Sequence, residues 1–193
     1  MKRLFDFFAS FFGLIVLSPL FIIIALVIGI GSKGGVFYKQ TRVGKNNKDF
    51  KVYKFRSMVI DADKKGLLSI GKGGRDPRVT KIGYALRKYK LDELPQLINV
   101  IKGEMSLVGP RPEVRKYVDL YSEKEKHVLE VRPGITDIAS ITYRNENDLL
   151  SQSDNPEEYY IKEIMPKKLS LSLNYIQTRS FLSDIKLIIK TIL

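Results

Sequence analysis

The N-terminal part of the chain is a long, uncharged apolar stretch. No residue from Phe7 to Ser32 carries a charge, which gives a run of 26 residues. As an α-helix this run would be about 39 Å long at 1.5 Å per residue, which is enough to cross a bilayer. A secretory signal peptide is shorter and ends at a small-residue cleavage site, which does not follow here. The pattern therefore predicts a membrane-embedded segment over residues 1–32 and a second domain over residues 33–193.

Pro19 lies near the middle of the apolar run. Proline offers no N–H to the carbonyl of Ile15 and its ring clashes there, so a helix bends, and the Ser18 hydroxyl is available to satisfy the freed carbonyl. Each arm would be about 18 to 20 Å long, too short to cross alone. Lys2 and Arg3 precede the run, basic residues also follow it, and basic flanks favour the cytoplasm. We favour a re-entrant helix-break-helix, although a proline-kinked spanning helix fits the same residues.

The hydrophobic pattern divides the remainder into short elements. Strands are expected over residues 36–40 and 50–58, joined by a turn at 44–47. Leu94, Leu97, Ile98 and Ile101 recur at helical spacing, so a helix is expected from near Asp92 to Gly103. Further expectations are a short strand at 105–108, a charged helix at 113–131, an extended piece at 135–143 and a polar loop at 145–156. The sequence thus predicts an α+β fold, mainly helical, with a small β-hairpin or sheet.

The C-terminus carries a second apolar pattern, this time on one face of a helix. The stripe has two lysines beside it and consists of Phe181, Leu182, Ile185, Ile188, Ile189 and Ile192. Such a helix either closes the core of the domain or lies amphipathically in the membrane interface. Periodicity alone does not decide between the two.

Charge is unevenly distributed along the chain. The formal net charge is +12, but residues 33–56 carry +7 and residues 113–163 carry −5. A positive cluster beside the apolar segment suits anionic lipid, phosphorylated substrates or nucleic acid. The absence of cysteine excludes disulfides, thiolate zinc sites and cysteine nucleophiles.

Asp92 and Glu93 are the candidate chemical groups. Acids at a helix start are often simple caps, because they accept hydrogen bonds from the first N–H groups and offset the helix dipole. Here the neighbourhood is strongly cationic, with Arg75, Arg78, Lys81, Arg87, Lys88 and Lys90 upstream and Arg111 and Arg115 downstream. Two acids among so many cations fit a phosphate site with a metal-binding carboxylate.

Several motifs carry a resemblance to the bacterial sugar transferase family, the monotopic phosphoglycosyl transferases. They are KFRSM at 54–58, DPRVTKIG at 76–83, LR at 86–87, LDELPQL at 91–97, SLVGPRP at 106–112 and RPGIT at 132–136. Their order and spacing match together, over nearly the whole chain and including the Ser18-Pro19 break. One stretch departs from the family: many members continue PGITGWAQV, whereas this chain has Asp137 to Ile141 as DIASI. Sugar preference is expected to differ accordingly.

The resemblance implies a two-step transfer. Asp92 would attack the β-phosphorus of a Mg²⁺-bound UDP-sugar and also bind the metal, UMP would leave, and a polyprenyl phosphate would then accept the phosphosugar. Glu93 would position the acceptor or assist the metal. The substrate-binding residues implied are Arg87 for a phosphate, the rigid Pro110-Arg111-Pro112 turn near the nucleotide, and Arg56.

The resemblance also implies a place in the cell and a set of partners. It favours the re-entrant helix and an interfacial C-terminal helix, with the catalytic domain on the cytoplasmic face of the inner membrane. The expected partners are the UDP-sugar, the polyprenyl phosphate and the bilayer, not nucleic acid, and a homodimer stays open. Two alternatives are retained: direct displacement without a covalent enzyme, and a non-enzymatic basic membrane adaptor.

Overall fold

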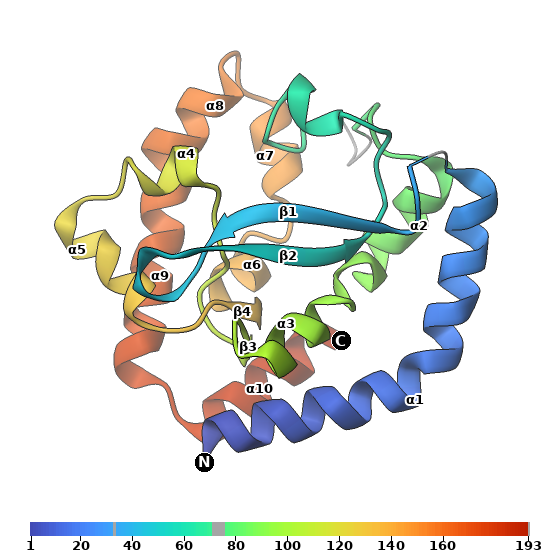
Figure 1. The fold of residues 1–193 in the computed structure, drawn as a ribbon. Coiled ribbons are helices and arrows are strands. Elements are labelled where there is room, and N and C mark those ends of the chain that lie inside the picture. The colour runs from blue at the N-terminus through green and yellow to red at the C-terminus, as the bar shows by residue number, and fades with distance from the viewer. Residues whose placement is uncertain (33, 71–75, 193) are drawn as a thin grey trace.

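The computed structural model describes residues 1–32, 34–70 and 76–192 and confirms a mainly helical α+β fold (Figure 1). Two small two-stranded sheets, β1-β2 and β3-β4, lie among helices. The strands are β1 (Phe37–Val43), β2 (Asp49–Phe55), β3 (Ser106–Val108) and β4 (Gly134–Thr136). The longer helices are α1 (Lys2–Gly31), α2 (Lys81–Lys88), α3 (Gln96–Lys102), α9 (Met165–Thr178) and α10 (Phe181–Ile192). The short ones are α4 (Arg115–Val118), α5 (Glu123–Lys126), α6 (Ile138–Thr142), α7 (Glu146–Ser151) and α8 (Pro156–Tyr159).

The apolar N-terminal run forms one helix, α1, with Pro19 inside it. Figure 1 shows α1 running along one side of the molecule and then turning sharply midway. The Ser18 hydroxyl donates to the Ile15 carbonyl at 2.7 Å, which confirms the expected partner for the carbonyl that Pro19 leaves free. Within the described residues, α1 is the one helix long and apolar enough to cross a membrane by length and composition.

The first turns of α1 are fixed to the rest of the chain by polar contacts. The Arg3 guanidinium donates to the backbone carbonyls of Val100 and Ile101, the second at 2.9 Å. Asp6 is buried and accepts a hydrogen bond from the Ser106 hydroxyl at 2.7 Å. These bonds join the start of the membrane segment to the end of α3 and to β3.

The last turns of α1 pack against a different part of the domain. Ile24 and Ile28 are buried in a cluster with Phe55 of β2 and Leu86 of α2. Much of the helix between its two attached ends exposes large apolar side chains, among them Phe12, Val16, Ile22 and Ile23. Both ends of the apolar segment therefore contact the same folded body, and the middle presents an apolar surface.

The predicted hairpin is present with shifted ends. β1 and β2 pair antiparallel from Phe37↔Phe55 to Val43↔Asp49. Asn46 and Asn47 adopt positive φ in the connecting turn, a conformation that asparagine tolerates better than most residues. β1 runs further than expected, and β2 ends at Phe55 because the next residues leave the hairpin to approach α2.

β3 and β4 form a parallel pair, with Ser106 opposite Gly134 and Val108 opposite Thr136. The two backbones come very close just beyond β3: a Cβ on Gly134 would lie 2.1 Å from the Gly109 nitrogen. Glycine at both positions is thus a packing requirement. Since parallel strands end at the same edge, the residues following β3 and β4 emerge side by side.

Three predictions about the C-terminal half are wrong in whole or in part. Residues 113–131 are not one helix, because the chain breaks after α4 and Ser122 begins α5 with a capping box to Glu125. Residues 135–143 leave the strand at once, because the Asp137 side chain caps α6. Part of the expected loop at 145–156 is α7, which buries Leu150 against the core beside α9.

The C-terminal helix α10 has two kinds of face. Leu187 and Asp184 are buried, and Leu187 packs with Val108 and Tyr175. Phe181, Leu182 and Ile189 are at least half exposed. The helix therefore closes part of the core through Leu187 and also carries an exposed apolar face.

Candidate active site

The Asp92-Glu93 pair lies in a tight turn rather than inside a helix. Leu91–Glu93 forms a single 3₁₀ turn, and α3 starts only at Gln96. The prediction of a helix from near Asp92 is corrected in this respect. The cause is Pro95, which has no N–H for the Leu91 carbonyl; the Leu94 N–H bonds that carbonyl instead.

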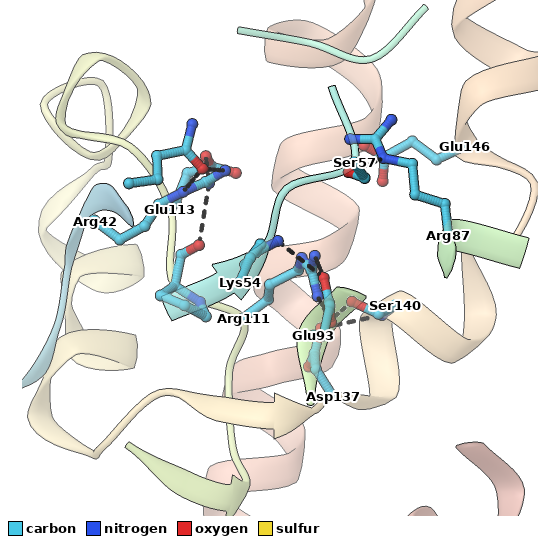
Figure 2. A network of polar contacts seen from close by, with 12 residues as sticks. Arg42, Lys54, Ser57, Arg87, Glu93, Arg111, Glu113, Asp137, Ser140 and Glu146 are labelled. Carbon is cyan, nitrogen blue, oxygen red and sulfur yellow. Dashed lines mark hydrogen bonds and ion pairs between the residues drawn. The ribbon is translucent and has the colours of Figure 1, made fainter. Parts of the chain in front are cut away.

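Glu93 is clamped by two cations from different elements. Its Oε1 is 3.0 Å from Lys54 Nζ on β2 and 2.5 Å from Arg111 Nη2, in the turn after β3. Arg111 Nη1 adds a 3.3 Å bond to Oε2, so the guanidinium binds the carboxylate through both oxygens. Figure 2 shows Lys54 and Arg111 converging on Glu93. This carboxylate is neutralised by its protein surroundings.

Asp92, the residue immediately before Glu93, has a different environment. Its side chain is 5% exposed and lines the large cleft described below. No hydrogen bond joins its carboxylate to any part of the chain that the structure describes. The turn therefore presents one paired and one unpaired carboxylate.

The two environments move the two pKa values apart. Burial raises the pKa of Asp92, and the adjacent Glu93 charge raises it further, against the opposing effect of Lys54 and Arg87. Burial would also raise the pKa of Glu93, but Arg111 and Lys54 outweigh it and hold that pKa well below the usual range. Neighbouring carboxyls with divergent pKa values are typical of sites in which the two have different roles.

The unpaired carboxylate opens into a cleft of about 1580 Å³. Three of its basic lining residues close to the dyad are Lys54, Arg87 and Lys90, all of which influence the pKa of Asp92 electrostatically. Another part of the lining is apolar, and its large side chains are each at least 39% exposed: Phe37, Val59, Ile60, Leu67, Tyr84 and Tyr89. A cleft lined by both basic and exposed apolar side chains suits a ligand that is itself part anionic and part apolar.

The predicted site residues are brought together only in part. Arg87, on α2, lines the cleft and lies beside Ser57 (Figure 2). It donates to the Ser57 hydroxyl at 3.2 Å and to the Ser69 hydroxyl at 2.9 Å. Arg56 also lines the cleft, but its guanidinium is bonded to the Gly35 and Phe37 carbonyls. The described cleft lining thus includes all three predicted arginines, Arg56, Arg87 and Arg111.

Pro110 and Pro112 do not line this cleft. The Pro110 carbonyl accepts from the Gly134 N–H at 2.9 Å, and the Pro112 carbonyl accepts from Arg42 at 3.2 Å. Their place is behind Arg111, where they fix the turn that carries it. Arg75, another of the cations counted around the dyad, lies outside the described residues.

Two site residues were missed by the sequence interpretation. Lys54 is part of the KFRSM motif but has no role in the sequence interpretation, yet its charged end is the second partner of Glu93. A signal for it existed, because an inward-facing lysine between Tyr53 and Phe55 on a half-buried strand needs an acidic partner. Asp137 was noted only as a departure from the family pattern; it is 3% exposed and lies beside Arg111 in Figure 2.

The donor set bears on how magnesium could bind. Among the described residues no group of three or more His, Cys, Asp and Glu side chains is placed to hold a metal. Asp92 is the carboxylate of the pair left without a cationic clamp. Mg²⁺ commonly uses one or two carboxylates together with ligand phosphates and water. The residues fit an ion held at Asp92 jointly with a phosphorylated ligand, and not a metal site built by protein alone.

Comparison with known proteins places the sequence clearly. The model of the family described as "Bacterial sugar transferase" matches residues 1–193. The chain is 35% identical to the exopolysaccharide production protein ExoY of Sinorhizobium fredii, over 99% of this chain and 83% of that protein. It is 38% identical to the uncharacterized sugar transferase EpsL of Bacillus subtilis, over 100% of this chain and 85% of that protein.

A longer relative has a more specific name. The chain is 39% identical to the UDP-glucose:undecaprenyl-phosphate glucose-1-phosphate transferase of Escherichia coli. The match covers 100% of this chain but 39% of that protein.

The unequal carboxylates predict opposite effects on stability. The raised pKa of Asp92 means that folding favours its protonated carboxyl. The contribution of this residue to the free energy of unfolding is therefore lost as pH rises through its folded-state pKa. Asp92→Asn should therefore unfold at the same or a higher temperature than wild type at pH 7 in detergent without divalent metal. The contribution of Glu93 is present above its unfolded pKa of about 4.3 and is lost as pH falls through its lower folded-state pKa.

Glu93→Gln should accordingly cost about 3 kcal/mol at pH 7, because it leaves Lys54 and Arg111 without their carboxylate. The loss should shrink as the wild-type protein is acidified. Thermal unfolding followed by circular dichroism measures both variants, which serve as matched controls for each other. Equal destabilisation by the two substitutions would contradict the assigned environments.

Proposed function

The chain belongs to the bacterial sugar transferase family and is thereby a transferase of substituted phosphate groups. On this basis we propose that it moves a sugar 1-phosphate from a UDP-sugar to a polyprenyl phosphate. The products are a polyprenyl-diphosphate-sugar and UMP. Such a product starts lipid-linked glycan assembly, in keeping with the exopolysaccharide relatives. The proposal applies to this chain the reaction that the name of the Escherichia coli relative describes.

The observation that carries the mechanism is the unpaired carboxylate of Asp92 beside the clamped carboxylate of Glu93. A carboxylate oxygen of Asp92 attacks the β-phosphorus of the UDP-sugar, and the bond between that phosphorus and the bridging oxygen breaks. UMP leaves with the electron pair of this bond, and the phosphosugar stays on Asp92. An oxygen of the polyprenyl phosphate then attacks the same phosphorus and releases the carboxylate.

The surrounding cations are suited to this exchange. Lys54, Arg87 and Lys90 favour the ionised form of Asp92, which the attack requires. Arg87 is positioned by Ser57 and Ser69 and presents positive charge to a phosphate in the cleft. Charge built up on the phosphoryl oxygens is stabilised most effectively by such preorganised donors. Glu93 holds Arg111 and Lys54 in place and is not itself a nucleophile.

The composition of the cleft supports a lipid acceptor. Its lining includes the exposed apolar side chains of Val59, Ile60, Leu67 and Tyr89 together with the charged dyad. A polyprenyl phosphate combines an apolar chain with an anionic head, so it matches both kinds of lining residue. A water-soluble acceptor would leave the exposed apolar side chains without a partner.

Magnesium is proposed as the cofactor. Asp92 would hold the ion together with diphosphate oxygens of the donor. When bound, the ion neutralises part of the phosphate charge. Arg87 binds phosphate. Lys54 and Arg111 form ion pairs with Glu93, so they leave the carboxylate of Asp92 unpaired.

The arrangement of α1 supports a re-entrant segment. Arg3 and Asp6 near its start and Ile24 and Ile28 near its end all contact the domain formed by the later residues. A helix whose two ends meet one folded body on one side of a bilayer has to enter and leave on that side. We therefore propose residues 1–32 as the re-entrant segment and residues 33–193 as a catalytic domain on the cytoplasmic face of the inner membrane.

The covalent mechanism predicts UMP release before any acceptor is present. Purified protein mixed with a UDP-sugar and magnesium, without lipid, should release about one UMP per active site, and polyprenyl phosphate should then restart release. Asp92→Asn should lose at least about 10³-fold in turnover because it removes the nucleophile. Release that needs the lipid from the start would favour direct displacement.

The same variant separates an enzyme from a membrane adaptor. Asp92→Asn should insert into membranes like wild type, so its loss of activity is not a loss of anchoring. An adaptor would release no UMP and would be indifferent to this substitution. Retained turnover in Asp92→Asn would overturn the assigned role of Asp92.

Removal of divalent metal should stop the first step. Excess EDTA is expected to abolish the UMP burst, and added Mg²⁺ should restore it, because the donor diphosphate is otherwise insufficiently neutralised. Isothermal titration of UDP in the presence and absence of Mg²⁺ gives a second readout that needs no turnover. A full burst in EDTA would remove magnesium from the proposal.

The re-entrant topology predicts where the N-terminus lies. A cysteine introduced at the start of this cysteine-free chain should react with a membrane-impermeant maleimide only after the cells are opened. A cysteine in place of Ser122, in the capping turn of α5, is the matched control for the domain side. Labelling of the N-terminal cysteine in intact cells would instead establish a spanning helix.

A further inference from the structure

The parallel pair β3-β4 brings two charged side chains to one edge. β3 leads through Gly109 and Pro110 to Arg111, and β4 is followed directly by Asp137. Because Val108 is opposite Thr136, the segments leaving both strands start at the same level. Figure 2 shows Asp137 beside the Glu93-Arg111 pair.

The two oxygens of Asp137 are in different situations. Oδ2 caps α6: it accepts from the Ser140 N–H at 3.0 Å and from the Ser140 hydroxyl at 3.2 Å. Oδ1 is buried and has no hydrogen-bond partner among the described residues. The whole side chain is 3% exposed. Burial raises the pKa of Asp137, and the N–H groups of Ser140 and Ala139 lower it. No hydrogen bond of good geometry reaches Oδ1 from the described residues, and a buried carboxylate oxygen without one calls for a further partner.

A small pocket lies against this carboxylate. It has a volume of about 40 Å³ and is lined largely by apolar residues; the lining residues with polar side chains are Arg111, Glu113, Tyr121, Asp137, Tyr160, Lys168 and Ser172. This is enough room for at least one ordered water, which needs two or more polar partners. Arg111 and Lys168 both act on Asp137 electrostatically, and Asp137 in turn stabilises the charged form of Arg111. Asp137, Arg111 and Lys168 therefore border the same small space.

We propose that an ordered water in this pocket joins Asp137 Oδ1 to the Arg111 guanidinium, and that Asp137 is a positioning residue for Arg111. The guanidinium is then held between two carboxylates, Glu93 directly and Asp137 through the water. Held in this way it cannot swing toward Asp92, so the nucleophile stays unpaired. The inference rests on the proposed function, because it assigns Asp137 a role through the arginine that clamps the dyad.

The test is a double-mutant cycle between Asp137 and Arg111. Asp137→Asn keeps one oxygen that can cap α6. It replaces the other oxygen by an NH₂ group and removes the negative charge that faces the cations. It should lower kcat for UMP release about tenfold, through displacement of Arg111, with donor KM changed less than about twofold. In an Arg111→Ala background the same substitution should cost less than about twofold. Ser140→Ala, which removes one bond to Oδ2 only, is the matched control and should stay near wild type.

A merely structural role gives a different result. If Asp137 serves only as a helix cap, Asp137→Asn keeps wild-type turnover, while Asp137→Ala lowers the melting temperature; that outcome overturns the proposal, as does an equal loss in both Arg111 backgrounds. Asp137→Ser, which can also cap a helix, replaces Asp137→Asn if the latter does not fold. A crystal structure of the wild-type protein should show a water within hydrogen-bond distance of Oδ1, and a dry pocket contradicts the bridge. A wild-type protein that releases no UMP from any UDP-sugar refutes the proposed function itself.

Discussion

Two adjacent carboxylates in a buried turn can keep their charges only if the protein treats them differently, and the clamp on Glu93 is how this chain does so. Lys54 and Arg111 neutralise Glu93 through both of its oxygens. Without them the turn would hold two repelling charges, and at least one would bind a proton. With them, Asp92 remains the carboxylate without a cationic clamp, and it lines an open cleft. The mechanism proposed for the site depends on this asymmetry.

The fold can be understood as the means of delivering the parts of that clamp. The hairpin supplies Lys54 from β2, Pro95 shapes the turn that carries the dyad, and the parallel pair β3-β4 supplies Arg111. Each part comes from a different segment of the chain, so no single motif contains the site. The close approach of Gly109 and Gly134 sets where Arg111 emerges.

Much of the fold and part of the site follow from the sequence. The apolar run, the break at Pro19, the hairpin and the C-terminal helix rest on local patterns that depend little on distant contacts. The 113–131 helix was wrong because its breaks come from a capping box and from packing of Tyr117 and Tyr121, which charge and periodicity do not reveal. The dyad and Arg87 were predicted from their motifs. The pairing of Lys54 with Glu93 joins residues 39 apart along the chain, and Asp137 and Arg111, 26 apart, meet only through the β3-β4 pair, so neither relation follows from spacing.

The hydrogen bond between Asp6 and Ser106 shows that the anchor is not a detachable tether. Ser106 opens the strand that carries Arg111, so the first turns of the membrane helix support the same strand from beneath. An enzyme built in this way has no clean border between the part that holds it in the lipid and the part that works. If the N-terminal helix were exchanged between related proteins, or removed to obtain a soluble form, the hydrogen bond that supports the start of β3 would be lost. The position of Arg111, and with it the turn that carries the dyad, would then be less firmly fixed.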